Sequence, residues 1–225
     1  TDIYNPETDK AIAKNFSAED PAGKKEDKVD LQREFSLPVR DDVPIIGMVS
    51  RLVSHKGLDL VKAVLDELLS TTDVQLVVLG TGDWEYENFF REIEARYPGK
   101  VGLRIAFIPD LARKIYAGCD MFLMPSKSEP CGLSQMLALR YGTLPIVRET
   151  GGLKDSITDS GDGEGNGFTF KSYNAHDMLD AIRRSLGAYS DKKYWASLVE
   201  ALKCDNSWGR SAREYMRLYR ETIGK

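Results

Sequence analysis

One carboxylate, Glu129, stands in a glycine-containing segment between an apolar run and a helical pattern. Residues 120–124 before it indicate a short buried strand, and residues 133–141 after it have helical apolar spacing. A strand-turn-helix junction presents free backbone N–H groups, which favour a phosphate. A carboxylate beside a bound phosphate is repelled by it unless the carboxylate also faces an electron-poor centre. An activated sugar that is joined through its anomeric carbon to a diphosphate supplies both groups.

The composition is ordinary for a soluble globular protein, with 42% hydrophobic and 29% charged residues among 225. A net charge of −4 gives no general attraction to nucleic acid or membrane, so any anion must be held by local cations. Cys119, Cys131 and Cys204 are widely spaced, which suits a reducing compartment and forms no zinc pattern. No apolar run approaches the roughly 20 residues of a membrane span. We therefore expect no metal site, no nucleic-acid partner and no membrane partner.

From Pro44 onward, short aliphatic runs alternate with longer helical patterns, which predicts an α/β fold with a doubly wound, mostly parallel, Rossmann-like sheet. The expected strands are 45–49, 74–79, 101–108, 121–124, 144–147 and a short 167–170, and the expected helices are 58–69, 86–97, 111–117, 133–141, 177–186, 194–202 and 211–222. Residues 155–166 are expected to form a loop. Residues 1–43 are polar and are expected to be a peripheral lead-in with a short helix at 30–35, so that 44–225 form the ligand-binding domain.

Ligands of such a sheet bind beyond the carboxyl ends of its strands. Arg51 and Lys56 follow the first expected strand. Arg51 offers a planar fork of donors suited to phosphate oxygens, and Lys56 is a point charge that can neutralise a neighbouring oxygen. Taken singly, each is more simply a solvated surface cation. Their position after a strand favours a pair that holds a departing diphosphate without a metal.

Gly80 and Gly82 follow the second expected strand and resemble the start of a dinucleotide fingerprint, but Glu85 occupies the third glycine position. A nicotinamide site is therefore disfavoured. The two glycines indicate either a tight turn that needs glycine dihedrals or a close approach to a ligand. Phe107, placed at the end of the third expected strand, can stack on a nucleobase or belong to the core, and the sequence supports both equally.

Gly151 and Gly152 follow the fifth expected strand and open another helix, with Thr150 as its cap. They can present backbone donors to a ligand or form a plain helix cap. Cys131 lies inside the Glu129 segment, but no motif links it to either histidine of the chain. It is therefore interpreted as a packed or ligand-adjacent thiol rather than a nucleophile.

Together, these motifs resemble the carboxyl-terminal half of bacterial glycogen synthases and plant starch synthases. The resemblance spans residues 5–208 and is carried by Ser50-Arg51-Leu52, Lys56-Gly57-Leu58-Asp59-Leu60, Pro125-Ser126, Glu129-Pro130-Cys131-Gly132-Leu133-Ser134-Gln135, Tyr141-Gly142-Thr143-Leu144-Pro145-Ile146-Val147-Arg148 and Thr150-Gly151-Gly152-Leu153. Those enzymes are retaining glycosyltransferases of the GT-B architecture, which has two facing Rossmann-like domains. They transfer glucose from ADP-glucose to the non-reducing end of an α-1,4-glucan.

The resemblance implies that Arg51 and Lys56 bind the ADP phosphates and that Glu129 lies beside the donor glucose. It implies that Phe107 matches a position where the family has an aromatic ring against adenine. Backbone groups of four consecutive residues would line the sugar and phosphate, namely Cys131, Gly132, Leu133 and Ser134. ADP-glucose is then a substrate, and no cofactor is expected. One departure is Ser128, which stands where the family commonly carries Phe.

The resemblance also implies a separate amino-terminal acceptor-binding domain, an α-1,4-glucan partner, and a location in the bacterial cytoplasm or plastid stroma. Without that domain the chain is expected to transfer no glucose. Two alternatives stay open: a GT-B transferase that uses UDP-glucose or another nucleotide sugar, and a noncatalytic nucleotide-sugar-binding module. The combination of Arg51, Lys56 and Glu129 argues against the module, because a pure binder has no chemical need for the carboxylate.

Overall fold

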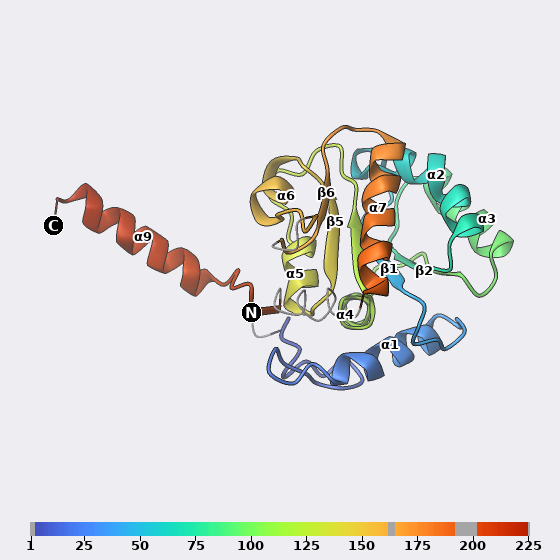
Figure 1. Ribbon diagram of the computed structural model, residues 1–225, viewed down its shortest axis with the longest axis horizontal. Coiled ribbons are helices and arrows are strands. Elements are labelled where there is room, and N and C mark those ends of the chain that lie inside the picture. Colours follow the sequence, from blue (N-terminus) through green and yellow to red (C-terminus); the bar gives the residue numbers. More distant parts are fainter. Residues whose placement is uncertain (1–2, 162–164, 192–201, 225) are drawn as a thin grey trace.

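A six-stranded parallel sheet forms the centre of the protein, in a computed structural model that describes residues 3–161, 165–191 and 202–224 (Figure 1). The strand order is β3-β2-β1-β4-β5-β6, and every pairing is parallel. The chain starts in the middle of the sheet, winds to one edge, returns to the middle and winds to the other edge. This is the doubly wound α/β fold that the alternating sequence pattern predicts.

The elements have the following bounds. The strands are β1 Ile45–Val49, β2 Gln75–Leu79, β3 Val101–Arg104, β4 Met121–Met124, β5 Leu144–Arg148 and β6 Phe168–Phe170. The helices are α1 Gly23–Glu34, the short 3-10 turn η1 Ser54–Lys56, α2 Leu58–Thr71, α3 Trp84–Arg96, α4 Pro109–Gly118, α5 Ser134–Arg140, α6 Gly151–Ser156, α7 Ala175–Ser190 and α9 Trp208–Thr222. The expected helix at 194–202 lies, except for its last residue, outside the described residues.

The third strand is shorter than the sequence predicts, because it ends at Arg104 rather than at residue 108. Within the described residues, β3 pairs with β2 alone, and the last residue of β2, Leu79, pairs with Arg104. Beyond that point no described strand continues the pairing, and Pro109 opens α4 with a fixed backbone dihedral. The residues between β3 and α4 are therefore a connection and not part of the sheet.

The strands are buried on both faces, which explains their continuous aliphatic runs. Ile46 and Met48 belong to one hydrophobic cluster, which also holds the apolar side chains of α2 and α7. Ile45 and Val77 belong to a second cluster, formed with α4 and with residues that precede β1. Alternate residues of each strand thus contribute to opposite layers of the fold.

The segment before β1 packs along the amino-terminal edge of the sheet, where Figure 1 shows α1 running beneath the strands. Ile12, Phe16 and Leu31 are buried in the second cluster. The ammonium group of Lys24 donates to the carbonyls of Ala117 and Tyr141, at 2.7 and 2.9 Å. The residues that α1 buries include polar ones, which explains why the sequence predicts a peripheral position for this segment.

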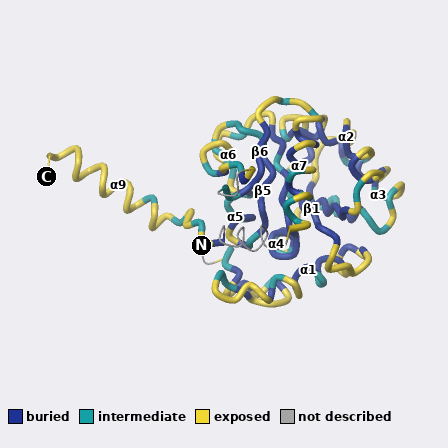
Figure 2. The backbone as a smooth tube through the Cα atoms, in the orientation of Figure 1, coloured by how far each residue is buried: buried dark blue, intermediate teal, exposed yellow. Residues whose placement is uncertain are grey.

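Helix α9 projects away from the body of the molecule, and its surface is exposed along its length (Figures 1 and 2). The hydroxyl of Ser207 caps its amino terminus by accepting the N–H of Arg210 at 3.3 Å. Trp208 is 83% exposed, and Tyr215 and Tyr219 are each 58% exposed. Within the described residues, no helix combines the length and apolar character needed to cross a membrane.

Candidate functional site

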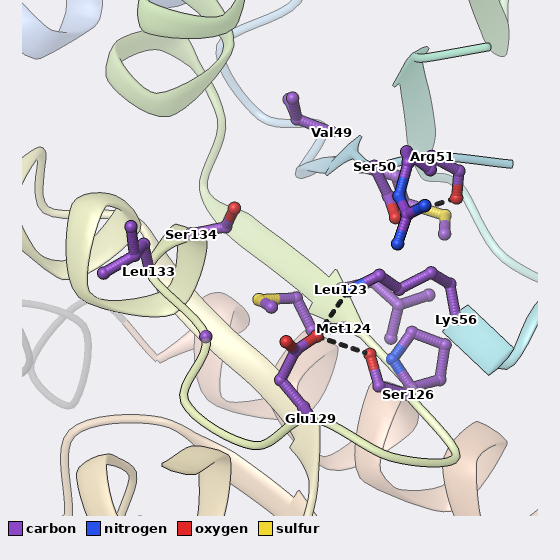
Figure 3. Close-up of a pocket in the computed structure, with 13 residues that line it drawn as sticks. Val49, Ser50, Arg51, Lys56, Leu123, Met124, Ser126, Glu129, Leu133 and Ser134 are labelled. Carbon is purple, nitrogen blue, oxygen red and sulfur yellow. Dashed lines mark hydrogen bonds and ion pairs between the residues drawn. The ribbon is translucent and has the colours of Figure 1, made fainter.

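A cavity of about 350 Å³ opens at the carboxyl ends of β1 and β4 (Figure 3). These strands are neighbours in the sheet but not in the sequence, so the chain turns away in opposite directions after each of them. Open α/β sheets bind their ligands at such a reversal of strand order. The lining comes from both strand ends and from the turns that follow, and consists of Met48, Val49, Ser50, Arg51, Lys56, Leu123, Met124, Pro125, Ser126, Glu129, Gly132, Leu133 and Ser134.

Lys56 and Glu129, which the sequence singles out in separate motifs, form an ion pair in this cavity. The Nζ atom of Lys56 lies 2.6 Å from Oε2 of Glu129 (Figure 3). Their side chains are 20% and 12% exposed, so the pair is largely shielded from water but open at the cavity. The hydroxyl of Ser126 donates to the same carboxylate oxygen at 3.3 Å. The site therefore presents a cation and a carboxylate in direct contact.

Arg51 lines the same cavity from the loop after β1. Its Nη2 atom lies 3.4 Å from Nε2 of His55, and the side chain is exposed. Among the residues that the structure describes, no carboxylate is paired with Arg51. Its guanidinium donors are therefore available to an anionic ligand, as the sequence predicts.

Close contact between two loops places Lys56 opposite Glu129. Gly57 has φ of +77°, and a side chain there would put a Cβ 2.0 Å from the carbonyl oxygen of Pro125. The N–H of Lys127 donates to the carbonyl of His55 at 2.9 Å. Glycine is required here because the backbone is left-handed and because the loop after β4 passes directly against the segment that carries Lys56, which leaves no space for a side chain.

The turn that joins β4 to α5 presents Gly132, Leu133 and Ser134 to the cavity. Gly132 has φ of +73°, in the left-handed region where glycine is favoured. Cys131 is exposed and lines a separate cavity behind the turn, so it is not brought to the Lys56–Glu129 pair. Ser128 is exposed in the same loop, so the residue at this departure from the family pattern does not pack into the core.

Thr150, Gly151 and Gly152 lie behind the Glu129 turn rather than on the cavity wall. The N–H of Gly152 donates to the carbonyl of Glu129 at 3.1 Å. A Cβ at Gly151 would lie 2.2 Å from that same oxygen, and one at Gly152 would lie 1.9 Å from the carbonyl of Cys131. Thr150 occupies the N-cap position of α6, but its side chain accepts no capping hydrogen bond, so the prediction of a threonine cap is wrong.

Gly80 and Gly82 also lie outside the lining of this cavity. Neither has positive φ, so the prediction of a turn that needs glycine dihedrals is wrong. A Cβ at Gly80 would lie 1.9 Å from the carbonyl of Ser50, and one at Gly82 would lie 2.2 Å from that of Leu52. Their small size lets the backbone after β2 run against the backbone after β1. A role in ligand contact stays a prediction.

Phe107 lies in the connection between β3 and α4 and is 88% exposed. The alternative that it packs in the core is therefore wrong. It does not line the cavity, and stacking on a nucleobase stays a prediction. An exposed aromatic ring beyond the strand ends is compatible with that role.

Two residues that the sequence did not assign to the site hold its loops in place. Arg148, the last residue of β5, donates from Nε to the carbonyl of Ser126 at 3.0 Å and from Nη2 to that of Lys127 at 2.6 Å. Gln135 is fully buried beneath the Glu129 turn. Both belong to the quoted motifs, but their contacts depend on strands and helices that meet only in the folded chain. Within the described residues, no group of three or more His, Cys, Asp or Glu side chains could hold a metal ion.

The fold and the cavity define a Rossmann-like domain with two cations and a carboxylate lining the cavity at the switch point of its sheet. The sequence comparisons agree with this class. The chain belongs to the glycosyl transferases group 1 family, whose pattern matches residues 31–202.

Curated relatives narrow the resemblance further. A glycogen synthase of Geobacillus thermodenitrificans is 53% identical over 227 residues, which cover all of this chain and 47% of that protein. A glycogen synthase of Clostridium acetobutylicum is 53% identical over 226 residues and is likewise covered over 47% of its length. The chain thus spans about half the length of these relatives.

Among solved structures, the catalytic domain of starch synthase IV from Arabidopsis thaliana, bound to ADP and acarbose, superposes with a TM-score of 0.89. It is 36% identical, and the match covers all of this chain and 48% of that one. The expected resemblance to one half of the glycogen and starch synthases is confirmed, as is the GT-B type of the fold.

Proposed function

We propose that this chain is the donor-binding domain of a retaining glucosyltransferase that moves glucose from ADP-glucose to the non-reducing end of an α-1,4-glucan. The observation that carries the proposal is the Lys56–Glu129 pair, 2.6 Å apart at the switch point of the sheet. Phosphate chemistry alone explains the lysine but not the carboxylate. The names of the glycogen synthase relatives and the ADP in the starch synthase IV structure support this donor.

In the proposed reaction, the bond between the anomeric carbon and the diphosphate oxygen breaks, and its electron pair goes to the departing ADP. Arg51 and Lys56 neutralise the charge that develops on the phosphate oxygens, together with N–H groups of the turn after Glu129. Positive charge develops at the anomeric carbon. The carboxylate of Glu129 stabilises this charge or orients the donor glucose. The acceptor hydroxyl then bonds to that carbon, and its proton passes to the phosphate oxygen of the departing ADP.

This chemistry requires no cofactor, because the donor sugar is already activated by its diphosphate. The acceptor site is proposed to lie on a second domain, in keeping with the 47% of the relatives' length that the chain spans. We further propose that this domain alone transfers no glucose. The reducing compartment expected from the cysteines is consistent with a cytoplasmic or plastid location.

The test is an elongation assay of the full-length protein that contains this chain, with glycogen as acceptor and ADP-glucose or UDP-glucose as donor. We expect elongation with ADP-glucose and a clear preference for it over UDP-glucose. A preference for UDP-glucose would assign another nucleotide sugar to the same site. Nucleotide binding without transfer to any acceptor would identify a noncatalytic module.

The role of Glu129 has its own test in the variant Glu129→Gln, which keeps the shape of the side chain but removes its charge. We expect turnover to fall by about two to three orders of magnitude, while the affinity for ADP, measured by calorimetry, changes less than tenfold. An equal loss in turnover and ADP affinity would make Glu129 a binding residue only.

A further inference from the structure

The side chain of Gln135 lies directly beneath the turn that carries Glu129, and it is 0% exposed. Its Nε2 atom donates to the carbonyl of Cys131 at 3.3 Å and to that of Gly132 at 3.0 Å. The same atom donates to the hydroxyl of Ser156, on α6, at 3.1 Å. One buried amide thus holds two consecutive carbonyls of the turn and ties them to a neighbouring helix.

Fixing a carbonyl also fixes the N–H of the next residue. The described peptide bonds are all trans, so the C=O and the N–H of one peptide point in opposite directions. Holding the carbonyls of Cys131 and Gly132 on the buried side directs the N–H groups of Gly132 and Leu133 to the other side. That side is the cavity, which both residues line. Neither N–H donates to an acceptor among the described residues.

The surroundings of Gln135 show that the amide is accommodated at some cost. A Cβ at Gly132 would lie 2.6 Å from Oε1 of Gln135, so the missing side chain of Gly132 makes room for the amide. The Oε1 atom is buried without a hydrogen-bond partner. A buried oxygen left without a partner is unfavourable, so packing alone does not account for a glutamine at this position. The donor end of the amide is the part that the turn uses.

We propose that Gln135 is a positioning residue that aims the N–H groups of Gly132 and Leu133 at the diphosphate of the bound donor. Gln135 does not touch the ligand and acts only through the two carbonyls. This inference rests on the proposed function, because it needs a diphosphate in the cavity.

The first experiment replaces Gln135 by Met in the full-length protein, which preserves most of the side-chain volume and removes the donor. We expect the KM for ADP-glucose and the inhibition constant of ADP to rise about tenfold or more, because two N–H donors to a charged group lose their orientation. The KM for the glucan should change less than twofold. A general loss of structure lowers the amount of active enzyme and leaves the two KM values unaffected.

Gln32→Met is the matched control. Gln32 is also 0% exposed, and its Nε2 donates to the carbonyl of Arg40 at 3.0 Å and to Oε1 of Gln75 at 2.8 Å. Because Gln75 begins β2, this amide lies at the opposite edge of the sheet. Gln32→Met should lower the thermal midpoint without changing the KM for ADP-glucose.

A second variant, Gln135→Glu, tests the donor directly and covers the case in which Gln135→Met does not fold. An ionised carboxylate opposes the two carbonyl oxygens, whereas a protonated one donates to a carbonyl. The KM for ADP-glucose should therefore fall toward the wild-type value as the pH is lowered. Three other charged side chains line the cavity beside Gln135, namely Asp155, Arg210 and Glu214. Because the wild type and the variant share them, the ratio of their KM values for ADP-glucose removes the pH dependence that these side chains contribute.

Donor KM values within twofold of wild type in Gln135→Met, or an equal rise in Gln32→Met, would overturn the inference. So would a ratio for Gln135→Glu that does not change with pH. Failure of the wild-type protein itself to bind ADP would instead overturn the proposed function, and this inference with it.

Discussion

Two lysine–carboxylate pairs lie at opposite ends of the same two strands, β1 and β4. Lys28 and Asp120 are 2.9 Å apart at the amino-terminal edge, with side chains 7% and 9% exposed. Lys28 also contacts the hydroxyl of Tyr189 at 2.8 Å, and Asp120 accepts the N–H of Ile45 at 2.8 Å. At the carboxyl-terminal edge, the Lys56–Glu129 pair has Ser126 as a further hydrogen-bond partner and opens on a cavity.

The two pairs differ in their hydrogen-bond partners, and this difference indicates a structural role for one and a ligand-binding role for the other. A buried ion pair is tolerated when further hydrogen bonds satisfy both groups, and the Lys28–Asp120 pair meets that condition while it anchors the start of β1. The Lys56–Glu129 pair keeps bonding capacity for a ligand. Under the proposed function, the phosphates of the donor compete with Glu129 for Lys56.

The largest expected effect comes from Lys56→Met in the full-length protein. We expect kcat/KM for ADP-glucose to fall about a thousandfold, equivalent to about 4 kcal/mol of transition-state stabilisation. The thermal midpoint should stay within a few degrees of wild type, because Glu129 still faces the cavity and keeps its bond to Ser126. Steady-state kinetics and a melting curve measure the two quantities.

Lys28→Met, the same substitution in the buried pair, should have the opposite profile. It leaves the carboxylate of Asp120 uncompensated, so the free energy of unfolding should fall by about 3 kcal/mol or more, with little change in the KM for ADP-glucose. Similar kinetic losses in both lysine variants would mean that the two edges of the sheet do not differ in role.

A smaller effect is expected from Gly152→Ala, which tests the support behind the Glu129 turn. The added Cβ would lie 1.9 Å from the carbonyl of Cys131, so the turn or α6 must move. We expect donor affinity to fall about tenfold with a destabilisation of about 2 kcal/mol. Gly187→Ala is the control, because a Cβ there meets nothing within 4 Å and lies inside α7. The control should gain stability, by about 0.5–1 kcal/mol; unchanged kinetics in Gly152→Ala would show that the turn does not depend on α6.

An effect on stability alone is expected at the amino-terminal edge, where the stability depends on pH. Burial raises the pKa of Asp27 from 3.8 to about 6, although the N–H of Lys14 donates to its Oδ1. The folded protein thus holds a proton between pH 4 and 6 that the unfolded chain has lost. This contribution to stability is full below the unfolded pKa and declines as the pH rises through the folded pKa.

Asp27→Asn cannot titrate, so its stability relative to wild type should increase by about 2 kcal/mol between pH 4 and pH 7. Denaturant unfolding at a series of pH values measures this change. The difference in the free energy of unfolding at any one pH depends on the hydrogen bond from Lys14, whereas the change of that difference with pH does not. A difference that stays constant with pH would contradict the raised pKa.

The alternation of strands and helices was predictable because the strands are buried on both faces and the helices that cover the sheet are buried on one, which leaves a clear apolar pattern. The end of β3 was not predictable from that pattern, because it depends on where β2 stops. The buried part of α1 was also hidden, since the residues that it buries include Asp27, Lys28 and Gln32, whose partners come from elsewhere in the chain.

The sequence by itself determined the fold class and the three groups, Arg51, Lys56 and Glu129, that meet in the cavity. Residue type and position after a strand are local properties, and the topology rule brings such positions to one edge. Only the tertiary structure decided that four glycines give room to neighbouring backbone, namely Gly80, Gly82, Gly151 and Gly152, and that Gln135 supports the turn. Such roles depend on which backbone passes within a few ångströms of another, and that proximity exists only once the chain has folded.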